Sequence, residues 1–588
     1  MSCRGRNLGG KAIAILFTIV VLCSSVLFFG CDKSSDDAAT KSSGNETDNT
    51  SSNNMSSNNK GNEIINIGEM FTGRDKEIGY DEEKAVLINL NESKIECASS
   101  LVDIKDNVAT IKGEGTFILS GKLSDGQIIV EASDTDKLQI VLDNADITCN
   151  SSAAIYIRSA DKVFVTLANG SDNLLTSKGK FINIDDNNID GVIFSKCDLT
   201  LNGAGTLTVS CENAHGIVSK KDLKITSGEY NITAAVHALS GKNSIRIADG
   251  TFNFVCNGDG LHADNEDDVK KGYIYVEGGS FEISSDDDGM SASSALMING
   301  GNVNITKCNE GLEGMYIDIN AGNISIVSGD DGINASGGNS NSNSMKGDSS
   351  LYISIAGGVT YVNAGGDGID SNGNIYISGG ELYISGPTNS ANGAIDYELE
   401  GIITGGTVVA AGSAGMAENF SSGSAQGSML VNISGMVTGE IIIKNSAGEV
   451  LARFTPDKSY NSVVISTPDI KVGETYTVSM AGEETTVNME STIYGSGFGN
   501  PGGFGNGGDR NGGNMGNGDN RGNKPDDMKM PDGMEVPDKG EKPDGMEFPD
   551  KGEKPDGIEF PDKGEKPDGI EFPDKGEMPD RMTPYDSL

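Results

Sequence analysis

The sequence predicts an all-β chain whose main part is a parallel β-helix, a solenoid built from coils of short strands. Three observations support this fold class: short alternating strands, glycine turns between them, and a repeat of constant length. One turn glycine recurs at positions 260, 289, 311, 332 and 368, with a base period of about 22 residues and occasional insertions. Strands this short cannot fold alone, so neighbouring coils must pair them in parallel, about 4.8 Å apart.

Each repeat contains three strand segments. The strand after a Gly-Gly or Ala-Gly turn is seen at 278–284, 300–305, 321–326 and 379–385, and it is preceded by a strand at 272–276, 295–298, 315–319 and 374–377. A third, shorter strand follows an Asp-Gly pair at 259–263, 288–292, 331–335 and 367–370. The alternation sends Ile, Leu, Val and Met inward and Ser, Asn, Tyr and Glu outward. A β-sandwich would also alternate, but it does not explain a fixed period.

The N-terminus predicts export. Basic residues precede an apolar run over 12–29 that stops at Gly30-Cys31, which is the pattern of a secretory signal. Residues 27–31 resemble a lipobox in which Cys31 is acylated, with Phe28 where the pattern usually has leucine. A plain membrane anchor is the alternative, because about 18 apolar residues could just span a bilayer. Both interpretations place the rest of the chain outside the cytoplasm, and we expect an extracellular lipoprotein anchored to the cell membrane.

The remaining segments differ in composition. Polar residues dominate 32–65, and Gly, Pro, Asp and Lys dominate 493–588, so both are expected to be disordered as a tether and a repeat tail. The β-helix is assigned to 66–425, with 66–85 as a cap over its open N-terminal end. Strands separated by turns at a spacing of about ten residues predict a small antiparallel β-module over 426–492.

Composition narrows the partners. The net charge is −42 and no basic stripe is present, so a nucleic-acid partner is excluded. The acidic composition of an exported chain suggests that the charge serves solubility, the binding of divalent cations, or both. We also expect the protein to be a monomer. Six cysteines remain beyond the signal and lipobox, without a CxxC pair; buried free thiols are favoured, and disulfides stay possible. They are Cys97, Cys149, Cys197, Cys211, Cys256 and Cys308.

Acidic residues crowd the turns beside the third strand of successive coils. One coil apart, these carboxylates would lie side by side and repel one another unless a cation neutralised them. Calcium takes six to eight oxygen ligands, so carboxylates from several coils could share one Ca²⁺ ion. The alternative is that some of them only form ordinary Asp-Gly turns. The acids concerned are Asp259, Asp264, Glu266, Asp267, Asp268, Asp286, Asp287, Asp288, Glu310, Glu313, Asp330, Asp331, Asp367 and Asp370.

Other candidate site residues are few. His215 and His237 are 22 residues apart and could stack, but turn-lining imidazoles are favoured over a zinc site. Outward tyrosines could form a ladder on which sugar rings stack, although structural stacking between strands is an equal alternative. The tyrosines predicted to contact carbohydrate are Tyr273, Tyr275, Tyr352 and Tyr376. No nucleophile elbow, phosphate loop or dinucleotide fingerprint occurs.

The segments 161–173, 259–264, 310–314 and 330–335 together resemble the clostridial carbohydrate-binding β-helix family, which is similar in structure to calcium-dependent pectate lyases. The resemblance covers roughly residues 90–490. It implies a right-handed parallel β-helix with several calcium ions at the acidic turns, bound by Asp259, Asp264, Glu310, Glu313, Asp330 and Asp331. Asp288, Asp367 and Asp370 join this ligand set from their position in the coils alone.

The predicted function is calcium-dependent binding of a polysaccharide at the cell surface without cleaving it. The resemblance implies an acidic pectin-type glycan such as polygalacturonate, cellulose, or both. A calcium-dependent polysaccharide lyase is the alternative, with Lys307 as the suspected base. The lack of arginine between Arg246 and Arg453 weighs against this elimination chemistry. A structural or adhesive surface protein is a third possibility.

Overall fold

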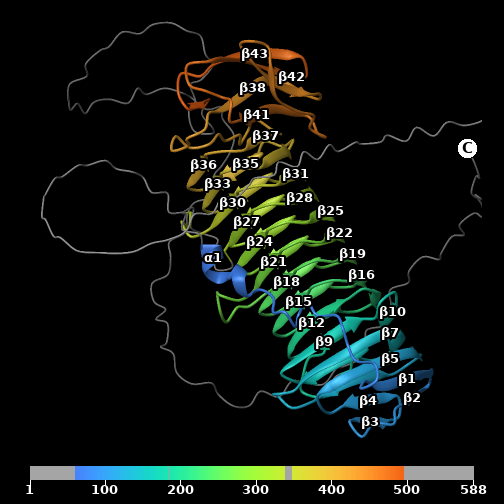
Figure 1. Cartoon of the computed structure of the whole chain (residues 1–588). Coiled ribbons are helices and arrows are strands. Elements are labelled where there is room, and N and C mark those ends of the chain that lie inside the picture. The colour runs from blue at the N-terminus through green and yellow to red at the C-terminus, as the bar shows by residue number, and fades with distance from the viewer. Residues whose placement is uncertain (1–59, 183, 338–346, 496–588) are drawn as a thin grey trace, which may run out of the picture. The chain divides into compact units, whose positions relative to one another are not determined.

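The structure is a computed structural model that describes residues 60–182, 184–337 and 347–495 (Figure 1). The predicted signal, the lipidation site Cys31, nearly all of the tether and nearly all of the tail lie outside these residues. The helices in the described part are the short α1 (Lys60–Ile64) and the 3-10 turn η1 (Ile67–Glu69). None of the helices in these ranges is long and apolar enough to cross a membrane.

The main body is a stack of coils with three parallel faces, which confirms the predicted parallel β-helix (Figure 1). Face 1 contains β4 (Val108–Ile111), β6 (Gln127–Glu131), β8 (Ile155–Ser159), β11 (Gly191–Ser195), β14 (His215–Ser219), β17 (Leu239–Gly241), β20 (Leu261–Ala263), β23 (Met290–Ala292), β26 (Leu312–Gly314), β29 (Ile333–Ala335), β32 (Ile369–Ser371) and β35 (Ile395–Tyr397).

Face 2 contains β9 (Lys162–Leu167), β12 (Asp198–Gly203), β15 (Asp222–Ile225), β18 (Ser244–Ile247), β21 (Tyr273–Val276), β24 (Ala295–Ile298), β27 (Tyr316–Ile319), β30 (Tyr352–Ile355), β33 (Asn374–Ile377) and β36 (Glu400–Ile403). Face 3 contains β10 (Asp172–Ser177), β13 (Thr206–Cys211), β16 (Glu229–Ala234), β19 (Thr251–Cys256), β22 (Ser280–Ser285), β25 (Asn302–Cys308), β28 (Asn323–Ser328), β31 (Val359–Ala364), β34 (Glu381–Ser385) and β37 (Thr407–Gly412).

The first coils use longer strands. β5 (Gly115–Leu123) pairs with β1 (Val86–Glu92) on one side and with β7 (Lys137–Cys149) on the other. The first half of β7 pairs with β9 of face 2 and its last residues pair with β10 of face 3, so this strand joins the two faces. The antiparallel strands β2 (Lys94–Glu96) and β3 (Val102–Lys105) pair with β1 and β4 at this end.

Columns of identical or similar apolar side chains fill the interior and set the register. On face 2, Ile245, Ile274, Leu296, Ile317, Ile353 and Ile375 follow one another from coil to coil, each fully buried. Burying such a side chain stabilises the fold by about 1.5–3 kcal/mol. A slip of one residue would turn every such column outward, so the hydrophobic pattern fixes how the coils stack.

The turn glycines before face 1 are required by close approach. A Cβ atom at Gly311 would lie 2.3 Å from the carbonyl oxygen of Gly332 in the next coil. The same clash, at 2.6 Å, would occur between Gly289 and the carbonyl oxygen of Gly311. These glycines keep successive turns in contact, and so bring the side chains that precede them into one column.

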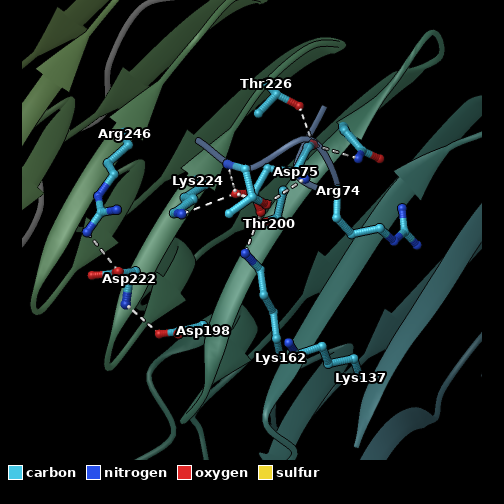
Figure 2. A network of polar contacts seen from close by, with 12 residues as sticks. Arg74, Asp75, Lys137, Lys162, Asp198, Thr200, Asp222, Lys224, Thr226 and Arg246 are labelled. Atoms are coloured by element: carbon cyan, nitrogen blue, oxygen red, sulfur yellow. Dashed lines mark hydrogen bonds and ion pairs between the residues drawn. The ribbon is translucent and has the colours of Figure 1, made fainter. Parts of the chain in front are cut away.

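Residues 60–80, which we call the N-terminal strap, lie along face 2 rather than over the open end that the sequence assigns to a cap at 66–85. At one end, α1 contacts β24 and β27, and Ile65 and Met70 bury tyrosines of this face. Farther along, Asp75 is fully buried and lies between Lys162, Thr200 and Lys224 (Figure 2). The apolar half of face 2 thus binds the apolar strap residues, and its basic part binds the strap carboxylate.

The C-terminal module follows the last coil. β41 (Tyr460–Ser466) pairs antiparallel with β37 and also with β38 (Ser428–Val437), which in turn pairs with β44 (Ile493–Tyr494). A separate four-stranded antiparallel sheet contains β39 (Ile441–Asn445), β40 (Val450–Phe454), β42 (Thr475–Met480) and β43 (Glu483–Asn488). The predicted small antiparallel sheet is therefore confirmed, and β41 covers the exposed edge of face 3.

Candidate metal centre of the acidic turns

One side chain from the turn before face 1 in each coil enters a continuous row, which we call the turn column. Its members, in coil order, are His215, His237, Asp259, Asp288, Glu310, Asp331 and Asp367. From His215 to Asp331, the residue after each member donates its N–H to the carbonyl of the next member, as from Gly260 to Asp288 at 3.0 Å and from Gly289 to Glu310 at 2.9 Å. This residue is a glycine in every case except Ala238. The regular backbone ladder therefore spaces these side chains one coil apart.

A second row, the strand column, lies on the outer side of face 1. The members are paired in parallel register from strand to strand: His262, Ser291, Glu313, Asn334, Asp370 and Asp396. Each member except Asp396 follows the turn-column residue of its own coil by three positions, as Glu313 follows Glu310 and Asp370 follows Asp367. The two rows therefore lie side by side and bring carboxylates from neighbouring coils together.

Backbone amides orient the carboxylates of the turn column. The N–H of Glu310 donates to Oδ1 of Asp288 at 3.1 Å, and the N–H of Asp367 donates to Oδ1 of Asp331 at 2.6 Å. Gly393 closes the series by donating its N–H to Oδ1 of Asp367. Each of these bonds fixes one carboxylate oxygen, so the side chains are held in place before any ligand arrives.

Two groups of three carboxylates result from this arrangement. Asp288, Glu310 and Glu313 form the first, and Asp331, Asp367 and Asp370 form the second; within each group the ligand atoms lie within 4.8 Å of one another. A third set, Asp259, Asp287 and Asp288, meets the same limit and shares Asp288 with the first group. These are all-oxygen donor sets, which suit a hard divalent cation such as Ca²⁺.

The electrostatic state of these carboxyl groups reflects their crowding. Burial, followed by the charges of Asp331, Asp396 and Asp367, raises the pKa of Asp370 to about 8. Burial also raises the pKa of Glu310 to about 7, with Glu313 adding to the shift. The pKa of Asp288 is raised for the same two reasons. Packing these like charges together is unfavourable without a cation, and a divalent ion would relieve the repulsion.

Asn334 supplies an independent indication of a ligand. This strand-column residue lies between Glu313 and Asp370, and only 9% of it is exposed. Its Nδ2 donates to Oε2 of Glu310 at 3.0 Å, whereas its buried Oδ1 has no hydrogen-bond partner. An unpaired buried amide oxygen is costly, and amide oxygens are ordinary calcium ligands. The residues of the two groups therefore fit Ca²⁺.

The structure brings seven of the nine predicted ligands into these groups: Asp259, Asp288, Glu310, Glu313, Asp331, Asp367 and Asp370. Asp264 and Asp330 are exposed and fall outside every group of three found in the described residues, so their assignment as ligands stays a prediction. Asp264 comes after strand β20 rather than before it, and Asp330 precedes the column position by one residue. Sequence reasoning did not select Asn334, because nothing local shows that its amide oxygen lacks a partner.

The histidine end of the turn column differs from the carboxylate end. The His237 and His262 rings are stacked, with centroids 4.0 Å apart and planes at 3°, and His215 stacks on His237 at 4.9 Å as predicted. Asp259 accepts from the N–H of Asp288 at 3.0 Å through Oδ1, and its Oδ2 lies 2.6 Å from Nδ1 of His262. Burial lowers the pKa of His237 to about 3, so this imidazole is neutral and accepts the N–H of Asp259. Asp259 is thus already engaged with protein groups.

Three of the four tyrosines predicted to contact carbohydrate are buried, which corrects that prediction. Tyr273, Tyr275 and Tyr352 are 6%, 2% and 5% exposed, because the N-terminal strap covers them. Tyr376 is 39% exposed and its ring lies 6.3 Å from that of Tyr352. The alternation of the strands correctly predicts that these side chains leave the interior, but not that another segment packs over them.

Lys307, the suspected base of the lyase alternative, is not held beside the carboxylate groups. It lies at the end of β25 on face 3, where the register with β22 is irregular, and its side chain is 64% exposed. Its ammonium group forms an ion pair with Asp286. The six cysteines of the described chain are free thiols, five of them buried and Cys97 half-buried.

The chain is a parallel β-helix with two rows of carboxylates beside face 1, and comparisons with known proteins show the family to which it belongs. Residues 105–347 match the family model described as "Carbohydrate-binding domain-containing protein". A protein of that description from Acetivibrio thermocellus is 38% identical over 207 residues, which are 35% of this chain and 72% of that protein. This chain therefore belongs to the carbohydrate-binding domain family.

A solved structure described as a polysaccharide lyase-like protein from C. thermocellum, gadolinium derivative, is also similar. It is 31% identical, with a TM-score of 0.38, and the match covers 40% of this chain and 96% of that one.

Proposed function

We propose that this protein binds a polysaccharide at the cell surface in a calcium-dependent manner and does not cleave it. Membership of the carbohydrate-binding domain family supports a glycan partner. The observation that supports calcium is the pair of three-carboxylate groups, with the unpaired amide oxygen of Asn334 between Glu313 and Asp370. The first group draws on two coils and the second on two others, so a bound cation would also join neighbouring coils.

Ca²⁺ would be held by Asp288, Glu310 and Glu313 in the first group and by Asp331, Asp367 and Asp370 in the second. When bound, calcium supplies positive charge that neutralises these carboxylates and attracts the carboxylates of an acidic glycan. A polyuronate such as polygalacturonate is the partner that needs such a cation most, because the protein is itself strongly acidic. Without calcium, like charges would keep the two polymers apart.

The placement at the cell surface rests on the secretory signal and on lipidation of Cys31, as predicted from the sequence. We propose that the body of the protein acts as a monomer held near the membrane by that lipid. The lyase alternative would need a base next to the bound uronate. Lys307, its candidate, is paired with Asp286 and exposed, so no observation favours cleavage.

The test combines binding with a search for cleavage. The full chain is incubated with polygalacturonate and calcium, the ultraviolet absorbance of unsaturated uronate products is followed, and the protein retained on the immobilised polymer is measured. We expect retention with calcium, loss of retention in excess EGTA, and no rise in absorbance. A steady calcium-dependent rise in absorbance that Lys307→Ala abolishes would mean a lyase and would refute the proposal.

Paired variants locate the calcium-dependent binding. We expect Glu313→Gln combined with Asp370→Asn to lose retention, because each change removes one charged ligand from a separate group. Asp264→Asn combined with Asp330→Asn removes the same charge from residues outside the groups and is the matched control. Equal losses for the two double variants would show that net charge, rather than the carboxylate groups, determines binding.

A further inference from the structure

Two buried carboxylates lie at the contact between the N-terminal strap and face 2, one toward each end of the strap. Asp75, in the strap itself, has the ammonium groups of Lys162 and Lys224 as counter-ions. Asp318, on β27 of face 2, is 1% exposed and forms no ion pair with another described residue. The two ends of the strap therefore surround a carboxylate in opposite ways, one with positive charge and the other without it.

The short helix α1 closes over Asp318. This helix contacts β24 and β27 (Figure 1), and the N–H of Gly61 donates to the hydroxyl of Tyr352 at 2.9 Å. That hydroxyl in turn donates to Oδ2 of Asp318 at 3.0 Å. In the same outward row, Met297 of the preceding coil is also fully buried, whereas Tyr376, two coils after Asp318, is 39% exposed. The burial of Asp318 thus depends on the strap above it.

The second oxygen of this carboxylate lacks a partner. Oδ1 of Asp318 is buried and accepts no hydrogen bond from the residues that the structure describes. The side chains that face it from the packed strands carry no positive charge, being Met297 on β24 and Tyr352 and Ser354 on β30. On α1, the titratable side chain that the structure describes is Glu63, which is exposed. An ionised carboxylate is costly to bury in such surroundings, and a protonated one is much less costly.

The proton equilibrium of Asp318 follows from this burial. Burial raises the pKa of Asp318 to about 6 from the usual 3.8, although the hydroxyl groups of Tyr352 and Ser354 offset part of the effect. Release of α1 would expose the carboxyl group and return its pKa toward the usual value. Because the docked state then holds this proton more tightly than the released state, docking is strongest at low pH and weakens as the pH rises from about 4 to about 6. Asp75 acts with the opposite sign, since its two lysine partners favour the ionised form.

We propose that the α1 end of the strap, residues 60–70, is a proton-dependent latch on face 2, closed while Asp318 is protonated and loosened when Asp318 ionises. The Asp75 end, residues 71–80, stays bound at neutral pH, so the strap remains attached to the solenoid. Loosening the α1 end uncovers Tyr316 and Tyr352 on face 2. The latch needs neither calcium nor a glycan, and it is therefore independent of the proposed function.

Hydrogen exchange of the full chain measures the two ends of the strap separately. The reporters are the amide of Ile65, which donates to the carbonyl of Gly61, and the amide of Thr72, which donates to Asp75. Each is expressed as a protection factor, the ratio of the intrinsic to the measured exchange rate, which removes the direct effect of pH on exchange. We expect the protection factor of Ile65 to fall about tenfold between about pH 5 and about pH 7.5, because docking weakens about tenfold per pH unit up to the pKa of the docked state. The protection factor of Thr72 should stay constant over this range.

Two matched variants test whether Asp318 is the group that titrates. Asp318→Asn removes the charge and keeps the shape of the side chain, so Ile65 should stay protected at both pH values. Glu400→Gln removes a charge of the same sign from an exposed position of face 2 on β36, and it should keep the wild-type dependence on pH. Melting curves report whether either variant disturbs folding.

Three outcomes would overturn the latch. The first is a protection factor of Ile65 that is equal at both pH values in the wild type, and this measurement decides even if Asp318→Asn does not fold. The second is the wild-type dependence on pH in Asp318→Asn, which would show that another group titrates. The third is a parallel loss of protection at Thr72, which would mean that the whole strap leaves face 2 rather than its α1 end.

Discussion

Replacing Asp75 by alanine should release the N-terminal strap from face 2. The Asp75 carboxylate is 0% exposed and lies between the ammonium groups of Lys162 and Lys224, whose side chains are 14% and 9% exposed (Figure 2). It also accepts hydrogen bonds from Thr200 at 3.0 Å and from the N–H of Thr72 at 2.8 Å. The substitution leaves two buried ammonium groups without their counter-ion.

The expected loss follows from that burial. Removing one partner of a buried ion pair costs about 3–5 kcal/mol, because the remaining charge stays buried and uncompensated. The measured loss cannot exceed the free energy with which the strap binds face 2, because the strap detaches once that free energy is used up. The substitution should therefore detach residues 60–80 while the coils stay folded. The solenoid itself keeps its inner columns, which do not contact Asp75.

Hydrogen exchange and urea denaturation measure this effect. In the Asp75→Ala variant we expect faster exchange of the strap amides, including those of Ile65 and Glu69, which bond within the strap. The control is Asp81→Ala, which removes a carboxylate from an exposed ion pair with Lys84 and should leave the free energy of unfolding nearly unchanged, because solvent screens that pair. Unchanged exchange in the Asp75 variant, or a loss no larger than in the control, would refute the assigned role of this buried network.

Three further predictions follow from the same contacts. In the folded state burial alone would raise the pKa of Asp75, but the hydrogen bond from Lys162, the N–H of Thr72 and the two lysine charges outweigh it and hold that pKa well below its usual range. The stabilisation of the strap by Asp75 should therefore be complete above about pH 4 and be lost as the pH falls further. Hydrogen exchange of the strap amides, followed during acid titration of the wild type and of Asp75→Asn, checks that stability falls with decreasing pH. Excess EGTA should lower the melting temperature of the wild-type chain, since calcium at a hundredfold excess over Kd stabilises each site by about 2.7 kcal/mol; an unchanged melting curve would count against the calcium sites. Ile317→Ala should lower the free energy of unfolding by about 2–5 kcal/mol because Ile317 is fully buried, whereas Ile182→Ala, at a side chain that is 62% exposed, should be near neutral in the same urea titration.

Much of the site was predictable because the repeat converts sequence spacing into spatial spacing. Once the turn glycines show a period, the acids before Gly289, Gly311, Gly332 and Gly368 must fall in one row. Asp264 and Asp330 lie outside the groups of three for a related reason, since a shift of a few residues along a turn places a side chain outside the row. The role of Asn334 could not be predicted, because an unpaired amide oxygen is a property of three-dimensional packing.

The amino-acid sequence by itself determined the coil architecture, the inward columns such as that of Ile317, the antiparallel module and the crowding of carboxylates at the turns. These features depend on the local residue pattern and its period, and every coil of the repeat contains the same pattern. Only the tertiary structure decided which outward faces meet solvent. The strap binds face 2 through Asp75 and buries Tyr273, Tyr275 and Tyr352, while face 3 stays open. This choice depends on contacts between residues far apart in the sequence, such as Asp75 with Lys162 and Lys224, which are 87 and 149 positions away, and no local pattern records them.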